Sequence, residues 1–351
     1  MDNPAEYEAV LKVLDMFGVG KPFSLQPAGG TASPKWAINS DKGRFIVRVR
    51  PSEFANIQSV CFDHKALARL TQSGLPVPAP LTRSDGTTWL CKDGKMYEVL
   101  HWVDGEPFNE SDLDAIAGLG VFLAWFHGAI DEIPPGKEGR LREDHPDLLE
   151  PYLVQLRKLA STKELQHKLD LVDREVRYVR EHLGEEFFGS LPHCIIHGDV
   201  HPGNLRFRGS QVSAVYDFDY LSLQARVRDV ADGLMFFAAK RKTFLDPSDI
   251  RSLTQPFVLD SERCRILLQG YQQSSPLAER EWQALPLVIR SRWIQMRLRG
   301  CRKVLEDKRI EFVLDGFSEV IQWLDRESST FFEELRRHAR PVGKFVHSSR
   351  K

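Results

Sequence analysis

Residues 197–204 carry the densest set of side chains in this chain that could do chemistry. They read His-Gly-Asp-Val-His-Pro-Gly-Asn, and a second polar cluster, Asp217-Phe218-Asp219, begins thirteen residues after Asn204. A carboxylate such as that of Asp199 can accept or orient the proton of a hydroxyl group. Carboxamide and carboxylate oxygens, here those of Asn204 and Asp217, suit a hard cation such as Mg²⁺. The two clusters therefore predict a site that combines a proton acceptor with a divalent metal ion.

The spacing of these residues favours phosphoryl transfer. In the kinase catalytic loop H-R-D-L-x-x-x-N, the Asp follows the His by two residues, the Asn follows the Asp by five, and a D-F motif comes later. His197, Asp199 and Asn204 reproduce both offsets. Because phosphoryl transfer depends mostly on positioning and charge stabilisation, we expect Asp199 to act as the base while Asn204 and Asp217 hold the metal. His197 is expected to organise the loop, and Asp219 to support it.

Short apolar runs position the two clusters. Residues 193–196 precede the first cluster, and the runs 205–207 and 212–216 lie between the two clusters. Runs of this length and composition are typical of buried strands. The two clusters then lie at adjoining strand ends of one hairpin and converge on one point.

Two other interpretations of the segment stay open. An Asp/Asn/Gly-rich segment also forms turns that cap their own backbone. The segment Gly198-Asp199-Val200-His201 also resembles the Gly-Asp-x-His opening of calcineurin-like metallophosphoesterases. In addition, His193, His197 and His201 recur every four residues, which on a helix would place them on one metal-binding face. Pro202 and Gly203 disfavour a helix there, and only two histidines follow, both in the basic tail.

The elements around the site predict two unequal lobes. Residues 1–103 show one helix, strand-like runs at 35–39, 44–50, 88–92 and 95–103, and a helical pattern at 56–72. Residues 104–337 are mostly helical, and residues 338–351 form a basic tail. The hinge between the lobes is expected at residues 98–105. Helical patterns in the second lobe cover 111–130, 148–160, 162–183, 228–240, 262–273, 278–305 and 312–337.

Composition excludes several classes of protein. The chain has 351 residues, enough for two domains, and its 48 Lys+Arg against 49 Asp+Glu give a net charge of −1, unlike a dedicated nucleic-acid binder. The apolar stretch 115–130 is shorter than the roughly 20 residues that a membrane span needs, so it predicts a core helix. The amino terminus is polar and the five cysteines are scattered, which predicts a cytoplasmic protein without membrane association.

With these motifs in place, the chain resembles the aminoglycoside phosphotransferase / choline kinase family over roughly residues 20–335. The 197–204 octet and Asp217-Phe218-Asp219 match its HGDxHxxN and (I/V)DF(D/E) motifs, and homoserine-kinase-like and stress-response-kinase-like members are most similar in pattern. The resemblance implies an α+β, two-lobed protein-kinase-like fold, with ATP and Mg²⁺ as cofactors. It also implies a small-molecule hydroxyl acceptor of the amino alcohol, amino acid or sugar type. Members acting on protein Ser/Thr leave a protein acceptor open.

The same resemblance assigns further site residues. His127 ends a Leu-x-x-x-His helix and is expected to be a core histidine bonded to the catalytic loop, and Asp229 is expected to hold that loop. The phosphate-covering loop corresponds to Gly29, Gly30 and Thr31, although it lacks the G-x-G-x-x-G pattern. The backbone contact with adenine is expected at Leu100, His101 and Trp102.

One departure from the family concerns the nucleotide phosphates. The family commonly has a Lys where this chain has Arg48, paired with a Glu on the next helix, where the best candidate is Asp63. We expect Arg48 and Asp63 to form the equivalent pair, with Arg50 as the competing phosphate contact. Loss of the usual pair alternatively indicates a non-catalytic nucleotide-binding module.

No sequence motif identifies the acceptor molecule. Between Ile289 and Val304 the chain carries six basic residues and no acid, and such a run is usually a solvated helix face. If some of these residues face the acceptor cleft instead, they favour a neutral or anionic acceptor over a polycationic aminoglycoside. The oligomeric state stays open, with a homodimer as the alternative to a monomer.

Overall fold

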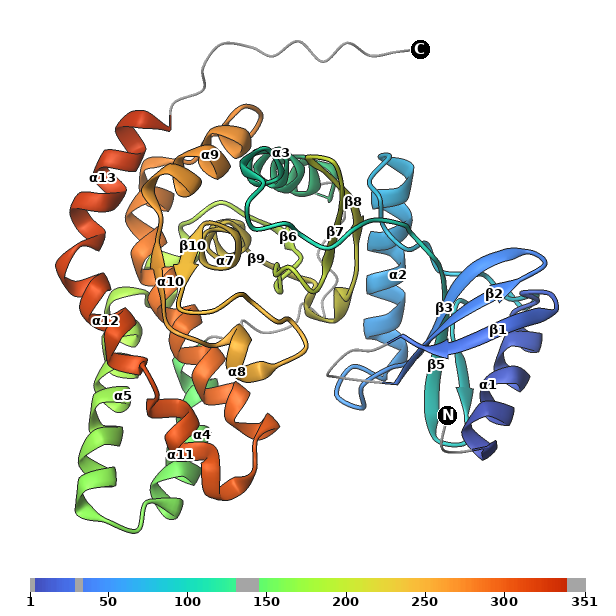
Figure 1. The fold of residues 1–351 in the computed structure, drawn as a ribbon, viewed down its shortest axis with the longest axis horizontal. Coiled ribbons are helices and arrows are strands. Elements are labelled where there is room, and N and C mark those ends of the chain that lie inside the picture. The colour runs from blue at the N-terminus through green and yellow to red at the C-terminus, as the bar shows by residue number, and fades with distance from the viewer. Residues whose placement is uncertain (1–3, 29–33, 131–144, 340–351) are drawn as a thin grey trace.

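The computed structural model describes residues 4–28, 34–130 and 145–339 of the chain. Its amino-terminal part is a five-stranded antiparallel sheet in the order β1-β2-β3-β5-β4, accompanied by two helices (Figure 1). The elements of this part are α1 (Pro4–Met16), β1 (Pro22–Pro27), β2 (Lys35–Ser40), β3 (Gly43–Val49), α2 (Ile57–Gln72), β4 (Leu90–Lys92) and β5 (Lys95–His101).

The sheet forms where the sequence alternates or runs apolar. In β2 every second side chain is buried, and the pairing of Ser40 with Gly43 leaves the two-residue turn Asp41-Lys42 between β2 and β3. The sheet and α1 enclose their own hydrophobic cluster, which includes Val13, Leu14 and Val47. The strand β1 was not expected from the sequence because its burial pattern is mostly exposed or intermediate.

The remainder of the chain is mostly helical (Figure 1). Its helices are α3 (Leu113–Ile130), α4 (Pro146–Leu159), α5 (Lys163–His182), α6 (Glu185–Gly189), α7 (Val227–Phe237), α8 (Ile250–Leu253), α9 (Ser261–Gln272), α10 (Glu279–Gly300), α11 (Arg309–Leu314), α12 (Phe317–Arg326) and α13 (Ser328–His338). Its strands form the pairs β6 (His193–Ile196) with β9 (Ser222–Ala225), β7 (Leu205–Arg208) with β8 (Gln211–Val215), and β10 (Ala239–Arg241) with β11 (Phe257–Leu259). Single 3₁₀ turns occur at Phe218–Tyr220, Cys301–Lys303 and Glu306–Lys308.

Two expectations about this part need correction. The predicted continuous helix 312–337 is three helices, because Gly316 adopts a left-handed conformation (φ +63°) between α11 and α12, and a second break separates α12 from α13. The predicted single hairpin is accompanied by the strand pairs β6–β9 and β10–β11. Of these strands only β6 was expected, because β9, β10 and β11, with three or four residues each, are too short to give a periodic signal. The lobe boundaries at 103/104 and 337/338 remain predictions.

The large helical core extends to α2. Leu67 and Leu70 of α2 belong to the same hydrophobic cluster as α3 and α10, so α2 joins the sheet to the helical part. The predicted core helix at 115–130 is confirmed as α3, which packs against α9 with a close backbone approach at Gly120 and Gly270. Among the described residues, α3 alone is long and apolar enough for a membrane span, and 56% of that window is buried inside the protein, as in a core helix.

Candidate active site

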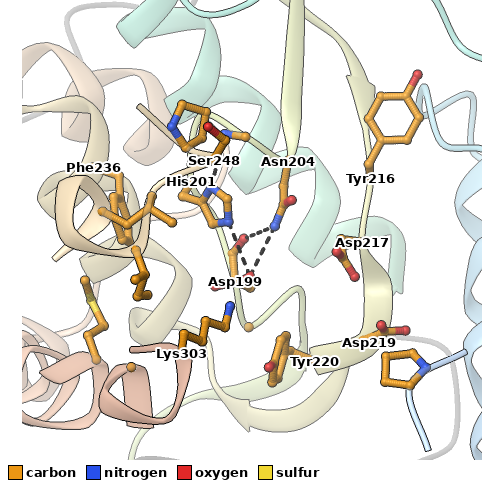
Figure 2. A pocket seen from close by; sticks show the side chains of 18 of the residues that line it. Asp199, His201, Asn204, Tyr216, Asp217, Asp219, Tyr220, Phe236, Ser248 and Lys303 are labelled. Carbon is orange, nitrogen blue, oxygen red and sulfur yellow. Dashed lines mark hydrogen bonds and ion pairs between the residues drawn. The ribbon is translucent and has the colours of Figure 1, made fainter. Parts of the chain in front are cut away.

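A cavity of about 680 Å³ lies between the sheet and the helical part. Its wall on the sheet side includes Lys35 and Ile46, and the connection between the two parts contributes Trp102 and Val103. The floor is made by the 197–204 loop and the residues after β8. Figure 2 shows Asp199, Asn204, Asp217 and Asp219 around this space. Both polar clusters of the sequence thus meet in one cavity.

The loop between β6 and β7 is held by a buried carboxylate on α7. Asp229 Oδ2 accepts the backbone N–H of His197 at 2.8 Å, and its Oδ1 accepts that of Gly198 at 2.9 Å. His127 Nε2 lies 3.2 Å from Asp229 Oδ2, while its Nδ1 lies 2.9 Å from the Tyr271 hydroxyl. Burial would raise the pKa of Asp229, but His127 and the loop amide lower it, so the carboxylate is ionised. His127 therefore contacts the loop through Asp229.

His197 and Gly198 fix the loop's path. The His197 Nδ1 accepts the N–H of Asp199, so the proton lies on Nε2, which donates to the Tyr216 carbonyl at 3.0 Å. This ring thereby connects the 197–204 loop to the residue that follows β8. Gly198 has φ +80°, and a Cβ at this position would lie 2.5 Å from the Tyr220 carbonyl oxygen. Only glycine fits both the backbone conformation and the close approach.

Asp199 faces the cavity among donors and positive charge. Its Oδ2 lies 3.2 Å from Asn204 Nδ2 and 3.4 Å from His201 Nε2, and its Oδ1 lies 4.0 Å from an Arg292 nitrogen (Figure 2). Burial would raise the pKa of Asp199, but His201 and Arg292 hold it well below its ordinary value. The carboxylate is therefore ionised at neutral pH and can orient or accept a hydroxyl proton.

Asn204 and Asp217 flank the β7–β8 hairpin. Leu205 pairs with Val215, so the two side chains emerge at the same end of the hairpin, as the sequence predicted. Asn204 uses its Nδ2 to donate to the Asp199 backbone carbonyl and carboxylate. Asp217 adopts a left-handed conformation (φ 63°, ψ 70°), which an aspartate tolerates better than most non-glycine residues.

These two residues fit a divalent cation that arrives with a phosphate-bearing substrate. Burial would raise the pKa of Asp217, but Lys35 and Arg48 lower it, so a charged carboxylate stands beside an amide whose nitrogen is already committed to Asp199. The described residues contain no cluster of three or more His, Cys, Asp and Glu side chains suited to a metal. Mg²⁺ is characteristically held by one or two carboxylates, with waters and substrate phosphates completing the shell. The donor set matches that pattern.

The expected pair of Arg48 with Asp63 is wrong. Arg48 instead lies 2.7 Å from Asp219, 3.4 Å from Glu98 and 3.7 Å from Asp217. Asp63 binds Arg50 at 2.5 Å, and Arg50 also contacts Glu98. The link between β3 and α2 thus runs through two arginines and Glu98, because the shorter Asp63 side chain meets Arg50, just after β3, rather than Arg48.

The expected nucleotide contacts differ in their placement. Trp102 lines the cavity, whereas Leu100 and His101 belong to β5. The amides of His101 and Trp102 donate to the carbonyls of Ala79 and Arg44, so these amides are already engaged within the sheet region. Gly29, Gly30 and Thr31 lie outside the described residues.

The basic run 290–303 is not a solvated face. Arg290 and Arg297 are buried, with Arg290 in contact with Glu175 and Asp325. Arg292 forms a two-pronged pair with Asp232 of α7, at 2.7 and 3.0 Å. Arg292, Arg299, Arg302 and Lys303 of this run line the cavity.

Several residues of the site were not predicted from the sequence. Lys35 of β2 binds Asp217 at 3.0 Å, and nothing in its local sequence marks it. Arg228 and Asp232 form an i, i+4 pair on α7, and Arg228 also donates to the Gly198 carbonyl. That spacing, on either side of Asp229, was a usable signal. His201 was considered only as a metal ligand, whereas its Nε2 faces Asp199.

The segment 193–203 also answers the metallophosphoesterase interpretation. His193 lies in β6, and its Nδ1 contacts the Leu191 carbonyl, while His197 and His201 lie in the following loop. Because the segment is strand and loop, the three histidines share no helix face.

Comparisons with known proteins agree with this geometry. Among curated relatives, homoserine kinase of Rhodopseudomonas palustris (strain BisA53) is 24% identical over 265 residues, covering 75% of this chain and 74% of the relative. Homoserine kinase of Janthinobacterium sp. (strain Marseille) is 21% identical over 294 residues, covering 82% and 83%.

Solved structures show the same fold. Amicoumacin kinase in complex with AMP-PNP, Ca²⁺ and Ami superposes with a TM-score of 0.65 at 14% identity, covering 96% of this chain and 95% of that one. The microcompartment-associated aminopropanol kinase gives 0.62 at 17% identity, covering 94% and 99%. Choline kinase from Cryptosporidium parvum gives 0.61 at 12% identity, with the same coverage. The predicted α+β kinase-like fold is confirmed.

The family itself is established by a direct match. Residues 24–263, more than half of the chain, match the phosphotransferase enzyme family. This range contains Asp199, Asn204, Asp217 and Asp229, and so the whole 197–204 loop with the Asp229 side chain that holds it. The prediction of a phosphotransferase is therefore confirmed: this chain belongs to the phosphotransferase enzyme family.

Proposed function

We propose that this chain is an ATP- and Mg²⁺-dependent kinase that transfers the γ-phosphoryl group to a hydroxyl of a small molecule in the cytoplasm. The observation that carries the proposal is the ionised Asp199 carboxylate, held in the cavity beside Asn204 and Asp217. The amino alcohol, amino acid and antibiotic kinases among the relatives and neighbours support a small acceptor.

The residues of this chain divide the work of the reaction. Asp199 orients the acceptor hydroxyl and takes its proton. As it does so, the hydroxyl oxygen forms a bond to the γ-phosphorus, and the bond between that phosphorus and the oxygen bridging to the β-phosphate breaks, which releases ADP. Asn204 and Asp217 would hold Mg²⁺, which neutralises charge on the phosphate oxygens. Asp229 keeps the loop in place through the amides of His197 and Gly198.

The cavity wall supports a neutral or anionic acceptor. Arg299, Arg302 and Lys303, at the end of α10 and in the turn after it, line the cavity, as does Arg292, which lies 4.0 Å from Asp199. Lys303 projects into this space in Figure 2. Cations concentrated at one end of a cleft repel a polycationic substrate and attract an anionic one.

The test is a panel of hydroxyl compounds coupled to ADP release. It includes homoserine, an amino alcohol, choline, a sugar, an aminoglycoside and a serine-containing protein. The proposal expects Mg²⁺-dependent ADP release with a neutral, zwitterionic or anionic small molecule, and release that depends on Asp199. Phosphate release from monoesters without ATP would contradict the proposal. So would ADP release with no acceptor of the panel other than the protein or the aminoglycoside.

A further inference from the structure

One face of the amino-terminal sheet presents a row of three charged side chains. Lys35 of β2 pairs directly with Arg48 of β3, and Arg48 pairs directly with Glu98 of β5. Residues directly opposite each other on antiparallel strands project from the same face. Both cations of this row reach the segment after β8: Lys35 contacts Asp217 at 3.0 Å, and Arg48 contacts Asp219 at 2.7 Å.

The two cations differ in what surrounds them. The Arg48 side chain is 6% exposed and lies among three carboxylates, those of Glu98, Asp217 and Asp219. It does not appear in the cavity wall, whereas Lys35, with 18% of its side chain exposed, does. The guanidinium is thus committed to the protein's own acids, and the ammonium stands at the cavity surface.

We propose that Lys35 on β2, rather than Arg48 on β3, supplies the cation that contacts the nucleotide phosphates. This inference rests on the proposed function. Asp217 is the carboxylate expected to hold the metal ion, so the phosphates that share the metal lie next to it, within the range of a flexible lysine whose Nζ already lies 3.0 Å from that carboxylate. A compact ammonium on a four-carbon stem can contact both the carboxylate and the phosphate oxygens.

Arg48 becomes a positioning residue in this arrangement. It joins Glu98 to Asp219, and Glu98 continues to Arg50, which binds Asp63 of α2. This chain of ion pairs connects the sheet, α2 and the segment after β8. It therefore fixes Asp219 and its neighbour Asp217 relative to Lys35.

The test measures nucleotide affinity rather than turnover. Isothermal titration calorimetry of the full chain with Mg·ATP, Mg·ADP and adenosine compares wild type with Lys35→Met. Lys35→Met is expected to weaken ATP and ADP binding about 10- to 100-fold, the factor that a hydrogen bond between charged groups contributes. Adenosine carries no phosphate, so its binding should stay unchanged, which also shows that the variant is folded. Lys35→Arg should recover part of the affinity.

A control variant is included, and the results that would overturn the inference differ from those that would contradict the proposed function. Lys65→Met removes an exposed lysine of α2 and should leave every affinity unchanged. If Lys35 merely neutralises Asp217, then Lys35→Met will bind ATP as tightly as wild type or more tightly, and the inference is overturned. A wild-type protein that binds no Mg·ATP would instead contradict the proposed function itself.

Discussion

At the scale of single residues, the site depends on what holds the catalytic loop as much as on the groups that face the substrate. Asp199 and Asn204 are placed by a loop whose backbone amides bind Asp229 and whose His197 ring binds the end of β8. His201 and Arg292 keep the pKa of Asp199 low, so in the proposed reaction this side chain is a permanent anion that orients the hydroxyl. Its strength as a base is correspondingly modest, and positioning carries more of the catalysis.

Gly198 provides a residue-scale prediction. Gly198→Ala places a Cβ 2.5 Å from the Tyr220 carbonyl oxygen in a left-handed conformation, so the free energy of unfolding should fall by roughly 2 kcal/mol or more. Urea denaturation measures the change. The control Gly128→Ala lies in α3 with no atom within 4 Å of its new Cβ, and should be neutral or stabilising by up to about 1 kcal/mol. Equal stability of the two variants would contradict the steric argument.

At the scale of elements, buried charged side chains connect helices and strands through ion pairs and hydrogen bonds. The row on the sheet connects through Glu98 and Arg50 to α2, and Arg290 connects α10 to α5 and α12. Arg297 of α10 donates to the backbone carbonyls of Thr254, Phe312 and Asp315, at the carboxyl-terminal ends of α8 and α11. These carbonyls have no partner within their own helices, so the guanidinium caps both ends.

The buried ion pairs of Glu98 predict a pH dependence of the protein's stability. Burial would raise the pKa of Glu98, but Arg48, Arg50 and His64 hold it well below the value of about 4.3 that an unfolded chain gives. A lowered folded-state pKa stabilises the protein above the unfolded value, and this stabilisation is lost as the pH falls below about 4. Glu98→Gln should therefore be less stable at pH 7 by about 3 kcal/mol and should lose less stability than wild type between pH 5 and pH 3. Parallel pH profiles of the two proteins in chemical denaturation would contradict this assignment.

Arg297 gives a second element-scale prediction. Burial lowers the pKa of Arg297 to about 10, so the group remains charged at neutral pH. Arg297→Met leaves several buried carbonyls without a donor and should lower the free energy of unfolding by roughly 3 kcal/mol or more. The exposed Arg280 on the same helix supplies the control, since Arg280→Met should change it by less than about 0.5 kcal/mol. Thermal or urea unfolding distinguishes the two, and a silent Arg297→Met would refute the capping role.

The sequence allowed prediction of those features that local spacing determines. The hairpin that brings Asn204 to Asp217, and the core helix α3, follow from apolar periodicity and motif offsets. The partner of Arg48 and the role of Lys35 depend on strand register between β2, β3 and β5, which no local pattern specifies. The burial of Arg290 and Arg297 was missed because the acids and carbonyls that compensate them lie far away in the chain.

At the scale of the whole molecule, the sheet and the helical part are the two structural parts (Figure 1), and residues of both line one cavity. The connection between them is tied to the helical part, since the Tyr216 hydroxyl donates to the Val103 carbonyl and Ser213 donates to the Asp104 carbonyl. The sheet supplies Lys35, the connection Trp102, the hairpin Asp217, and α10 the cationic wall. Under the proposed function, the nucleotide and the acceptor share this cavity, and the acceptor hydroxyl lies at Asp199.

The most direct test of this account compares binding with turnover in Asp199→Asn. The variant keeps the shape of the side chain but replaces a carboxylate oxygen with an N–H donor and removes the charge. Its turnover, measured as Mg²⁺-dependent ADP release with the best acceptor, should therefore fall by about 10²–10⁴-fold. Its dissociation constant for Mg·ATP, measured by calorimetry, should not change. Turnover of Asp199→Asn at the wild-type rate, with binding intact, would contradict the central role given to this carboxylate.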